Sequence, residues 1–442
     1  MIKQKLIPEL RFPEFKNEGE WEETTLGDIG NFIGGGTPDT AETKYWNGNI
    51  QWYTPTEVKE GKVGKSIRTI TEDGLRNSSA KLLPKGSLLL TTRATIGDIA
   101  IADFECTTNQ GFQSLVVNET EANTFWFYWI IQHKNELLKK ASGSTFPEIG
   151  KNEITKIKAL KPNKYEQQRI ASCLSSLDEV IAAHSQKLDA LKNHKKGLMQ
   201  NLFPQSRLNC DSFDSNDEND FNNQSNQENH KNHSSDNIPK YRFKEFEKDG
   251  EWVEKKLSEM SIIGRGKSKH RPRDAEHLYG GKYPFIQTGD IRKADLYLSN
   301  YTQTYSDKGL KQSKLWNENT LCITIAANIA ETSILKIKAC FPDSIIGLIT
   351  NEKVANILFI KYSFDVFKER IQSLSQGVAQ ENLNQEKLSN IEFSFPSIQE
   401  QQKIASCLSS LDALITAQAE KIEQLKLHKK GLMQGLFPKM SE

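Results

Sequence analysis

Residues 32–36 and 266–268 carry the two patterns in this sequence that come nearest to cofactor-binding loops. The first reads Phe-Ile-Gly-Gly-Gly and matches the F-x-G-x-G loops that bind S-adenosylmethionine, in which glycines let the backbone approach the cofactor. Such a loop should follow a buried parallel strand, and its companion Asn/Asp-Pro-Pro-aromatic tetrapeptide is absent from the chain. The pattern therefore favours a tight turn, or a close approach of the backbone to a phosphate.

The second pattern, Gly266-Lys267-Ser268, matches only the end of a phosphate-binding P-loop, because Ser261 occupies the position of its first glycine. Asp39 and Glu42 lie too close together in sequence to reach the adjacent strands that a nuclease metal site uses. The eight histidines show no ligand spacing. We therefore expect this chain to perform no chemistry and to bind no cofactor or metal.

A cluster of cationic side chains gives a stronger signal, and that signal is for binding. Six of the nine residues 265–273 are Arg, Lys or His, and no acidic residue occurs before Asp274. The loop contains glycine and proline, so its long side chains are free to reach phosphates and base edges. The corresponding loop of the first half, residues 34–40, offers backbone amides and hydroxyls instead of charge. A solvated basic loop is the alternative interpretation.

Further polar residues follow predicted strands in both halves of the chain. Asn, Gln, Arg and Thr are the side chains that discriminate base edges, so these positions suit sequence recognition. The candidate DNA-contacting residues are Gly35, Gly36, Thr37, Thr54, Thr56, Thr92, Arg93, Thr95, Asn109, Gln110, Lys267, Lys269, Arg271, Arg273, Thr288 and Asn328.

The elements that must position these loops are organised around a repeat. Residues 166–205 and 400–439 are identical at 27 of 40 positions without a gap, which indicates a duplicated architecture. The first copy carries a three-and-four spacing of apolar residues, typical of a heptad seam. These residues are Ile170, Leu174, Leu177, Ile181, Leu188, Leu191, Leu198 and Leu202. We predict two long helices that pair with each other as a coiled coil; a duplicated core helix is the alternative.

The ends of the two predicted helices also carry signals. A polar residue stands three positions before a glutamate in each copy, Asn163 before Glu166 and Ser397 before Glu400, which predicts a capping box. Each copy stops at a proline. Gly197 and Gly431 cost about 1 kcal/mol each relative to alanine and are places where the last turns could break away.

Each half places a globular domain before its helix. The segments 8–29 and 239–260 share Arg-Phe, Glu-Phe and Gly-Glu-Trp at equal spacing. Short apolar runs between Gly and Pro turns predict strands, and apolar helices are predicted over 121–141 and 352–374. The predicted strands are Ile50–Tyr53, Ser87–Thr92, Ser114–Val117, Tyr283–Gln287, Thr320–Ile325 and Ile345–Thr350. The fold class is α+β: two similar α/β domains separated by the two long helices, with an internal pseudo-two-fold repeat.

Composition divides the chain further. The segment 206–237 is nearly all polar and carries a net charge of −5, so the remainder is +6, which permits a polyanionic partner. The expected divisions are 1–162 and 238–396 for the two domains, 163–205 and 397–442 for the helices, and 206–237 for a disordered acidic linker. Because 36% of residues are hydrophobic and no apolar run is long enough to span a bilayer, we expect a soluble, cytoplasmic protein. The six cysteines contain no C-x-x-C pair and are interpreted as structural thiols.

Together these features resemble the specificity subunits of type I restriction-modification systems, over essentially the whole chain. The features that carry the resemblance are RFPEFKNEGEW (11–21) with RFKEFEKDGEW (242–252), the phrases GGGTPDT, TTRATIG and TNQGF, and the repeated IASCLSSLD and HKKGLMQ. The resemblance implies two target-recognition domains that are joined by two antiparallel helices and read a bipartite double-stranded DNA sequence with a fixed, unread gap. It also implies two modification (methyltransferase) subunits and restriction (translocase and nuclease) subunits as partners, with S-adenosylmethionine, ATP and Mg bound in those partners.

Two other functions stay open at this stage. A self-contained DNA methyltransferase or nuclease requires residues 32–36 or 39–44 to be catalytic, and binding of S-adenosylmethionine by the isolated chain would identify it. A coiled-coil scaffold that does not bind DNA requires the basic and Asn/Gln-rich loops to be incidental. Salt-dependent DNA binding by the assembled complex distinguishes that scaffold from a DNA-reading protein.

Overall fold

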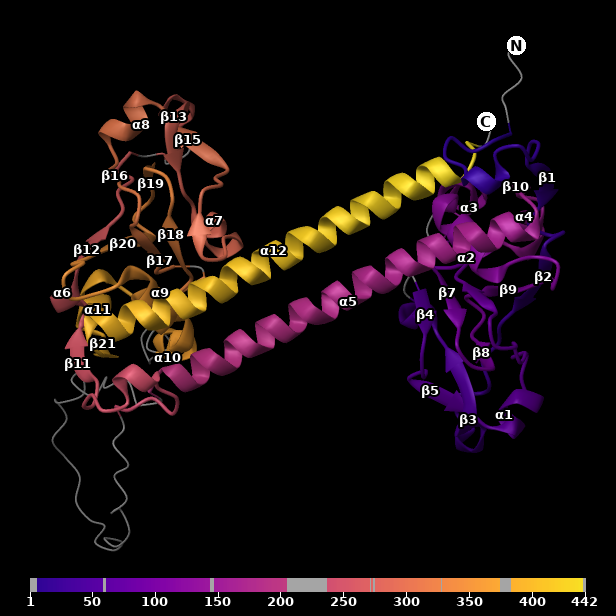
Figure 1. Ribbon diagram of the computed structural model, residues 1–442, viewed down its shortest axis with the longest axis horizontal. Coiled ribbons are helices and arrows are strands. Elements are labelled where there is room, and N and C mark those ends of the chain that lie inside the picture. The colour runs from indigo at the N-terminus through magenta and orange to yellow at the C-terminus, as the bar shows by residue number, and fades with distance from the viewer. Residues whose placement is uncertain are drawn as a thin grey trace, which may run out of the picture. The chain divides into compact units, whose positions relative to one another are not determined.

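The computed structural model describes residues 6–58, 61–143, 147–204, 237–270, 272, 275–326, 328–373 and 383–439. The chain forms two compact units: unit 1 comprises residues 1–186 and 420–442, and unit 2 comprises residues 187–419. Two 39-residue helices, α5 (Lys164–Leu202) and α12 (Ile398–Leu436), each begin in one unit and end in the other (Figure 1).

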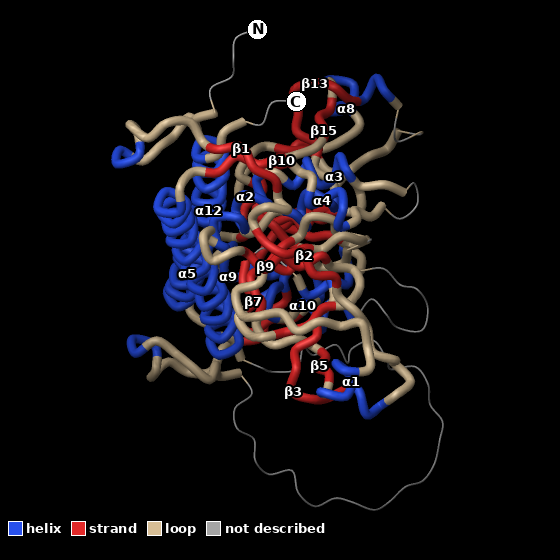
Figure 2. Tube along the Cα trace, turned by 90° about the vertical axis from the view of Figure 1, so that its right-hand side faces the viewer, coloured by secondary structure: helices blue, strands red, loops and turns tan. Residues whose placement is uncertain are grey.

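Unit 1 contains a five-stranded sheet, a three-stranded sheet and a two-stranded pair, whose strands are red in Figure 2. In sheet order, the strands are β2 (Gly30–Gly34), β9 (Gln113–Val117), β6 (Leu88–Leu90), β7 (Ile99–Ala102) and β4 (Gly61–Val63); then β5 (Arg68–Ile70), β3 (Trp46–Tyr53) and β8 (Cys106–Thr108); then β1 (Glu22–Thr25) and β10 (Lys158–Lys161). The shorter helices are α1 (Glu72–Arg76), α2 (Asn123–Gln132), α3 (Lys134–Lys140) and α4 (Lys151–Thr155).

Unit 2 repeats this plan with sheets of five, four and two strands. Their order is β12 (Ser261–Arg265), β20 (Ile345–Thr350), β17 (Leu321–Thr324), β18 (Thr332–Leu335) and β14 (Tyr297–Leu298); then β15 (Gln303–Tyr305), β13 (Tyr279–Phe285), β19 (Ala339–Cys340) and β16 (Leu315–Trp316); then β11 (Val253–Lys256) and β21 (Glu392–Phe395). The shorter helices are α6 (Leu257–Met260), α7 (Thr288–Lys293), α8 (Asp307–Lys311), α9 (Ile357–Val366), α10 (Lys368–Ser373) and α11 (Gln385–Asn390). The predicted fold class, two similar α/β domains with two long helices, is confirmed.

The long helices run in opposite directions, as ion pairs within each unit show. In unit 1, Asp178 near the start of α5 pairs with Lys429 near the end of α12, 2.6 Å apart. In unit 2, Lys195 near the end of α5 pairs with Asp412 near the start of α12, again at 2.6 Å. Both helices continue without a break through Gly197 and Gly431.

The apolar positions of the helices have two different roles. At the start of α5, Ile170 and Leu174 belong to the core of unit 1, and at its end Leu202 belongs to the core of unit 2. Between these ends, residues such as Ile181 and Leu188 are only half-buried. The helix ends therefore serve as core helices, which was the alternative interpretation of the repeat.

Each unit is completed by the last residues of the helix that arrives from the other repeat. Phe437 packs against Trp21 and Phe125 in unit 1, with ring centroids 6.4 and 5.4 Å away. Phe203 packs against Trp252 and Phe359 in unit 2, at 6.2 and 5.3 Å. The Leu and Phe of the repeated Leu-Phe-Pro motif thus complete the aromatic core of each unit.

The end of α12 also lies beside the start of the described chain, as the antiparallel arrangement predicts. The amide of Leu10 donates to the carbonyl of Gly435 at 2.8 Å, and Lys439 pairs with Glu9. The repeat shows the same contact in unit 2, where the amide of Tyr241 donates to Asn201 at 2.9 Å. The acidic linker, residues 206–237, lies outside the described residues except for Asn237.

The two apolar helices predicted over 121–141 and 352–374 are each divided in two. His133, with φ −106° and ψ 24°, separates α2 from α3, and Phe367, with φ −99° and ψ 11°, separates α9 from α10. The continuous helices that the apolar pattern indicated are therefore wrong at the same place in both domains. The break lets the second helix start in a new direction with Lys134 or Lys368 as its first residue.

The predicted capping boxes are only half formed. Asn163 Oδ1 accepts from the amide of Glu166 at 3.0 Å, as expected at a helix start. The Glu166 carboxylate, however, accepts from Arg11 Nε and Nη2 at 2.8 and 2.7 Å instead of returning to the cap residue. Glu400 does the same with Arg242 in unit 2. A bidentate, charge-assisted bond to arginine is stronger than a bond to a neutral backbone amide, so the glutamate carboxylate binds the arginine.

Replacing Glu166 by Gln should destabilise unit 1 by about 3 to 5 kcal/mol, because Arg11 and Glu166 are only 7% and 1% exposed and the arginine charge would lose its partner. Glu14→Gln is the matched control, since its pair with Arg169 is half-exposed and should contribute less than about 1 kcal/mol. Hydrogen exchange measures the effect, with unit 2 amides as the internal reference. Equal protection of unit 1 in both variants would contradict the expectation.

Candidate nucleic-acid interface

The glycines of the loop after β2 are required by the protein's own backbone. A Cβ on Gly35 would lie 2.0 Å from the carbonyl oxygen of Asn109, and one on Gly36 would lie 2.3 Å from the amide of Ala80. Glycine is therefore required at both positions because neighbouring chain segments occupy the space that a side chain would take, and the approach of a phosphate to this backbone stays a prediction. Thr37 lies at the surface of the same loop and donates its hydroxyl to Gln110 Oε1 at 2.6 Å.

The residues Thr54 and Thr56 lie on the turn that follows β3, beside the loop that carries Asn109. Their hydroxyl oxygens are 3.0 Å apart, and the Glu57 carboxylate accepts from both the amide and the hydroxyl of Thr54 at 2.8 Å. Gly111 touches Pro55 so closely that an added Cβ would lie 2.9 Å from its Cγ. The structure therefore brings the loops at 35–37, 54–56 and 109–110 together.

The fourth predicted cluster lies on the turn between β6 and β7. We name residues 92–97 the first reading turn. Its start is joined to the loop at 109–111, because the amide of Thr92 donates to the carbonyl of Gly111 at 2.8 Å. The Thr92 side chain is 1% exposed and its hydroxyl donates to the same carbonyl at 3.1 Å, so Thr92 supports the turn and is not available for a base contact. Arg93 and Thr95 are exposed.

Sequence reasoning missed the partner of Arg93. Its guanidinium pairs with Glu148 at 2.8 Å, and both side chains are nearly half exposed. Glu148 lies 55 residues further along the chain in a segment without a motif, so no local pattern signals the pair. A screened, exposed pair of this kind is weak, and Arg93 can exchange Glu148 for another anion.

In unit 2, the basic loop after β12 occupies the same place in the fold as residues 34–40. The amide of Lys267 donates to Phe341 at 3.1 Å, just as the amide of Gly36 donates to Thr108 at 2.8 Å. Lys267 and Lys269 are exposed, whereas Ser268 between them is buried. Arg271 and Arg273 lie outside the described residues. Equivalent backbone positions therefore present charge in unit 2 and small polar groups in unit 1.

Lys314 is a further cation of this surface that the sequence did not reveal. Its ammonium lies 3.5 Å from the centroid of the Trp316 ring. Burial, together with the positive charge of Lys267, lowers the pKa of Lys314. An anion bound near Lys267 and Lys314 would offset the repulsion between the two lysines and stabilise the ammonium form of Lys314.

Thr288 and Asn328 are both associated with α7. Thr288 is the first residue of this helix, and Arg292 on its next turn lies 3.5 Å from Asn328 Oδ1. Gln287 precedes the helix and donates to Gln303 Oε1 at 2.5 Å. We name residues 325–330 the second reading turn, of which residue 327 is not described. Each domain thus gathers amide, hydroxyl and cationic side chains on neighbouring loops.

The described residues do not support the catalytic alternatives. Residues 32–34 lie within β2, which pairs antiparallel with β9, so the parallel-strand context of an S-adenosylmethionine loop is missing. Asp39 uses its carboxylate to accept from the amide of Ala41 at 2.9 Å. Within the described ranges, no group of three His, Cys, Asp or Glu side chains could hold a metal ion, and no helix is long and apolar enough to cross a membrane.

The described cysteines are free thiols. They are Cys106, Cys173, Cys322, Cys340 and Cys407; Cys210 is not described. Burial raises the pKa of Cys106 to about 12, and it also raises the pKa of Cys322. A thiol that stays protonated is a poor nucleophile and metal ligand.

Comparison with known proteins identifies relatives of both halves. The chain is 34% identical over 189 residues to the type I restriction enzyme MjaIX specificity subunit of Methanocaldococcus jannaschii, a match that spans 42% of this chain and 44% of that protein. It is 23% identical over 435 residues to the MjaVIII specificity subunit of the same organism, covering 97% of this chain and 93% of the relative. The crystal structure of a type I restriction-modification S subunit from M. genitalium shares the fold, with a TM-score of 0.59 at 15% identity over 98% of this chain and all of that one.

A family model described as the type I restriction modification DNA specificity domain matches residues 18–193 and 249–427. These two matches cover most of the chain and correspond to its two repeats. The relatives are named specificity subunits of type I restriction enzymes, which agrees with the expectation that this chain is the specificity subunit of such an enzyme. The chain belongs to the family of type I restriction-modification specificity proteins.

Proposed function

We propose that this chain is the DNA-reading subunit of a type I restriction-modification complex. Unit 1 reads one half of a bipartite target, and unit 2 reads the other half. Adenine methylation and ATP-driven cleavage belong to separate modification and restriction subunits, which bind S-adenosylmethionine, ATP and Mg. The chain itself contributes sequence selection and the surfaces on which the modification subunits dock.

One observation carries this proposal: the same backbone framework occurs twice with different side chains at the same surface. Gly36 and Lys267 make the same backbone bond, yet one loop continues with Thr37 and the other with Ser268 and Lys269. A scaffold would have no reason to keep the frame and vary this surface. Two domains that read different bases need both, because contacts to base edges depend on side-chain type while their position depends on the frame.

The proposal is tested by mapping methylation in the assembled complex on a library of duplexes with randomised targets. Arg93→Ala or Gln110→Ala should relax recognition in one half-site only, with a loss of about 1 to 3 kcal/mol for each lost base contact. The other half-site is the control within the same molecule. A phosphate-only role would instead weaken all sequences equally and flatten the salt dependence. Methylation by the isolated chain would favour the catalytic alternative.

We propose that the long helices set the gap between the half-sites. Inserting four residues between Ala183 and Leu188, and four before Ile422, lengthens each helix by about 6 Å, which corresponds to about two base pairs at 3.4 Å each. Both half-sites should survive while the unread gap changes length. Four residues inserted within the polar segment 206–237 are the control and should leave the gap unchanged. Altered half-sites with an unchanged gap would rule out the helices as the ruler.

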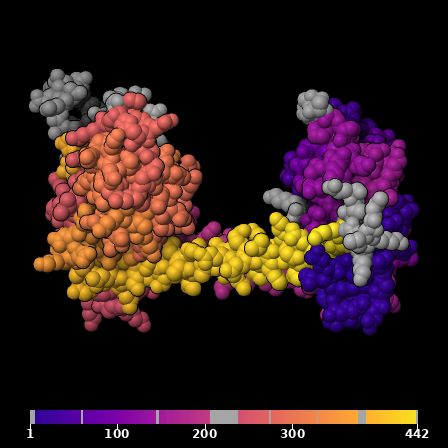
Figure 3. Space-filling view, turned by 90° about the horizontal axis from the view of Figure 1, so that it is seen from above, coloured from indigo at the N-terminus to yellow at the C-terminus, as the bar shows by residue number. Residues whose placement is uncertain are grey.

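The docking surfaces are inferred from exposed positions that the two repeats have kept identical. Gln168, Ser172 and Ser176 are exposed on one face of α5, and the corresponding residues of α12 are Gln402, Ser406 and Ser410. Some other exposed positions of the helices have diverged; for example, Ala182 corresponds to Thr416. Exposed residues are free to change after duplication unless a partner binds them. Figure 3 shows that the yellow surface of α12 is exposed along much of its length.

An open groove in unit 1 lies against this stripe. It is lined by Gln168, Ser172 and Ser175 of α5 together with the segments 84–87 and 116–124. An identical surface on two related helices fits two copies of one protein partner. We therefore propose that one modification subunit docks at the start of each long helix.

A bulky side chain in the stripe should remove one docked subunit. Ser172→Tyr should give a complex with one modification subunit instead of two, and Ser172→Tyr with Ser406→Tyr should give none, because tyrosine prevents close packing at the contact. Ala182→Tyr is the control on an exposed position that has diverged. Native mass spectrometry measures the stoichiometry. Two bound subunits in the double variant would place the docking surface elsewhere.

A further inference from the structure

Both reading turns are held by the same internal hydrogen bonds. The Thr91 hydroxyl donates to the carbonyl of Thr95 at 2.5 Å and accepts from the amide of Asp98 at 3.1 Å. In unit 2 the Thr324 hydroxyl donates to the carbonyl of Asn328 and accepts from the amide of Glu331 at 3.0 Å. One threonine hydroxyl thus closes each turn across its base.

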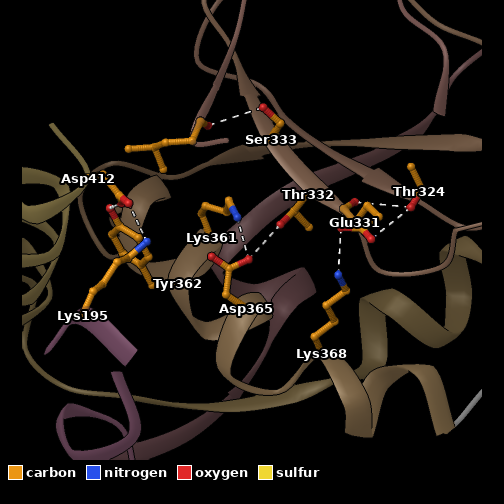
Figure 4. Close-up of polar contacts among 11 residues, drawn as sticks. Lys195, Thr324, Glu331, Thr332, Ser333, Lys361, Tyr362, Asp365, Lys368 and Asp412 are labelled. Carbon is orange, nitrogen blue, oxygen red and sulfur yellow. Dashed lines mark hydrogen bonds and ion pairs between the residues drawn. The ribbon is translucent and has the colours of Figure 1, made fainter. Parts of the chain in front are cut away.

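An ion pair then joins each turn to a neighbouring short helix, α3 in unit 1 and α10 in unit 2. Lys134, the first residue of α3, lies 2.5 Å from Asp98, and Lys368, the first residue of α10, lies 2.8 Å from Glu331. The stem of Lys134 also covers the turn, because a Cβ on Gly97 would lie 2.8 Å from its Cγ. Figure 4 shows Lys368 pointing at Glu331 beside Thr324.

The same kinked helices are attached to both long helices. The Tyr128 hydroxyl of α2 donates to Asp178 at 2.6 Å, and the same carboxylate pairs with Lys429. In unit 2, Tyr362 of α9 donates to Asp412 at 2.7 Å, and Lys195 completes the group, as Figure 4 shows. Each reading turn is therefore connected to the long helices through two consecutive short helices, α3 and α2 in unit 1 and α10 and α9 in unit 2.

The sequences of the turns differ although their supports are the same. The first turn presents Arg93 and Thr95, and the second presents Asn328. The acidic residue changes from Asp98 to Glu331, but a carboxylate faces a lysine ammonium in both units. The ion pair occurs in both units, whereas the exposed residues of the turns differ. This indicates that the pair supports the turn and is not part of the base contact itself.

We propose that the Asp98–Lys134 and Glu331–Lys368 pairs are positioning pairs that hold the two reading turns in the conformation that meets base edges. The proposal rests on the proposed function and assigns specificity to four residues outside the base-contacting set. Base readout depends on donor and acceptor placement to a fraction of an ångström. Breaking either pair loosens one turn and leaves the other domain unaffected.

The test uses the full complex and methylation mapping on duplexes with randomised targets. Asp98→Asn and Lys134→Met should each reduce discrimination between cognate and mismatched bases in the first half-site by about tenfold, within the range that one base pair carries. The second half-site should not change. The matched control is Glu136→Gln with Lys139→Met, which removes a more exposed pair of a carboxylate and a lysine within α3.

The main competing explanation is a direct contact between the lysine and a phosphate. It predicts that Lys134→Met weakens binding to all sequences, whereas Asp98→Asn strengthens binding by releasing the lysine. Positioning predicts the same loss of discrimination in both variants. In unit 2, Glu331→Gln and Lys368→Met should act on the second half-site, and the exchange Glu331→Lys with Lys368→Glu should restore discrimination there.

The outcomes separate the inference from the function on which it rests. Unchanged half-sites in all four single variants, or no rescue by the charge exchange, would overturn the positioning role while target selection by the wild-type complex stands. A wild-type complex that methylates without sequence preference would overturn the proposed function itself. Normal hydrogen exchange in the cores of the variants excludes global unfolding as the cause of a positive result.

Discussion

In each unit, one partly buried carboxylate joins the globular domain to both long helices; it is Asp178 in unit 1 and Asp412 in unit 2. Each carboxylate accepts a hydrogen bond from a tyrosine hydroxyl of α2 or α9. Each also forms an ion pair with a lysine of the other long helix. Burial, followed by the bond to the carboxylate, raises the pKa of Tyr128 and Tyr362, so both tyrosines remain donors. Partners of this kind offset the cost of partly removing a carboxylate from water. The attachment of domain to helices depends on this geometry in both repeats.

Exchange of helix ends between the repeats explains how one chain forms two equivalent units. Leu436 and Phe437 complete the aromatic core of unit 1, and Leu202 and Phe203 complete that of unit 2. Neither repeat can bury its core without the last turns of the other. The leading segments are held in the same way, since Arg11 and Arg242 reach the first turns of α5 and α12. Duplication has therefore produced interdependent halves.

The residues that fasten this frame are different from the exposed residues that we propose read DNA. The residues that fasten the frame are the same or chemically equivalent in both units: Arg with Glu, Tyr with Asp and Lys, and an acid with Lys at the reading turn. The exposed loops carry Thr37, Arg93 and Gln110 in one unit and Lys267, Lys269 and Asn328 in the other. A rigid support permits the exposed side chains to change without loss of the fold.

Features that depend on local pattern or on the repeat could be predicted from the amino-acid sequence. Periodicity predicted the two long helices, and the alignment of the halves matched residues 34–40 with the basic loop, because backbone bonds follow from the repeated strands. Which side chains remain exposed and able to contact a partner became clear only from the tertiary structure. Thr92 is buried, Arg93 meets Glu148, Lys314 stacks on Trp316, and Glu166 leaves its cap for Arg11, 155 residues away. Each of these contacts joins segments far apart in the chain or depends on side-chain burial, and pairing and burial are properties of packed surfaces that local spacing does not encode.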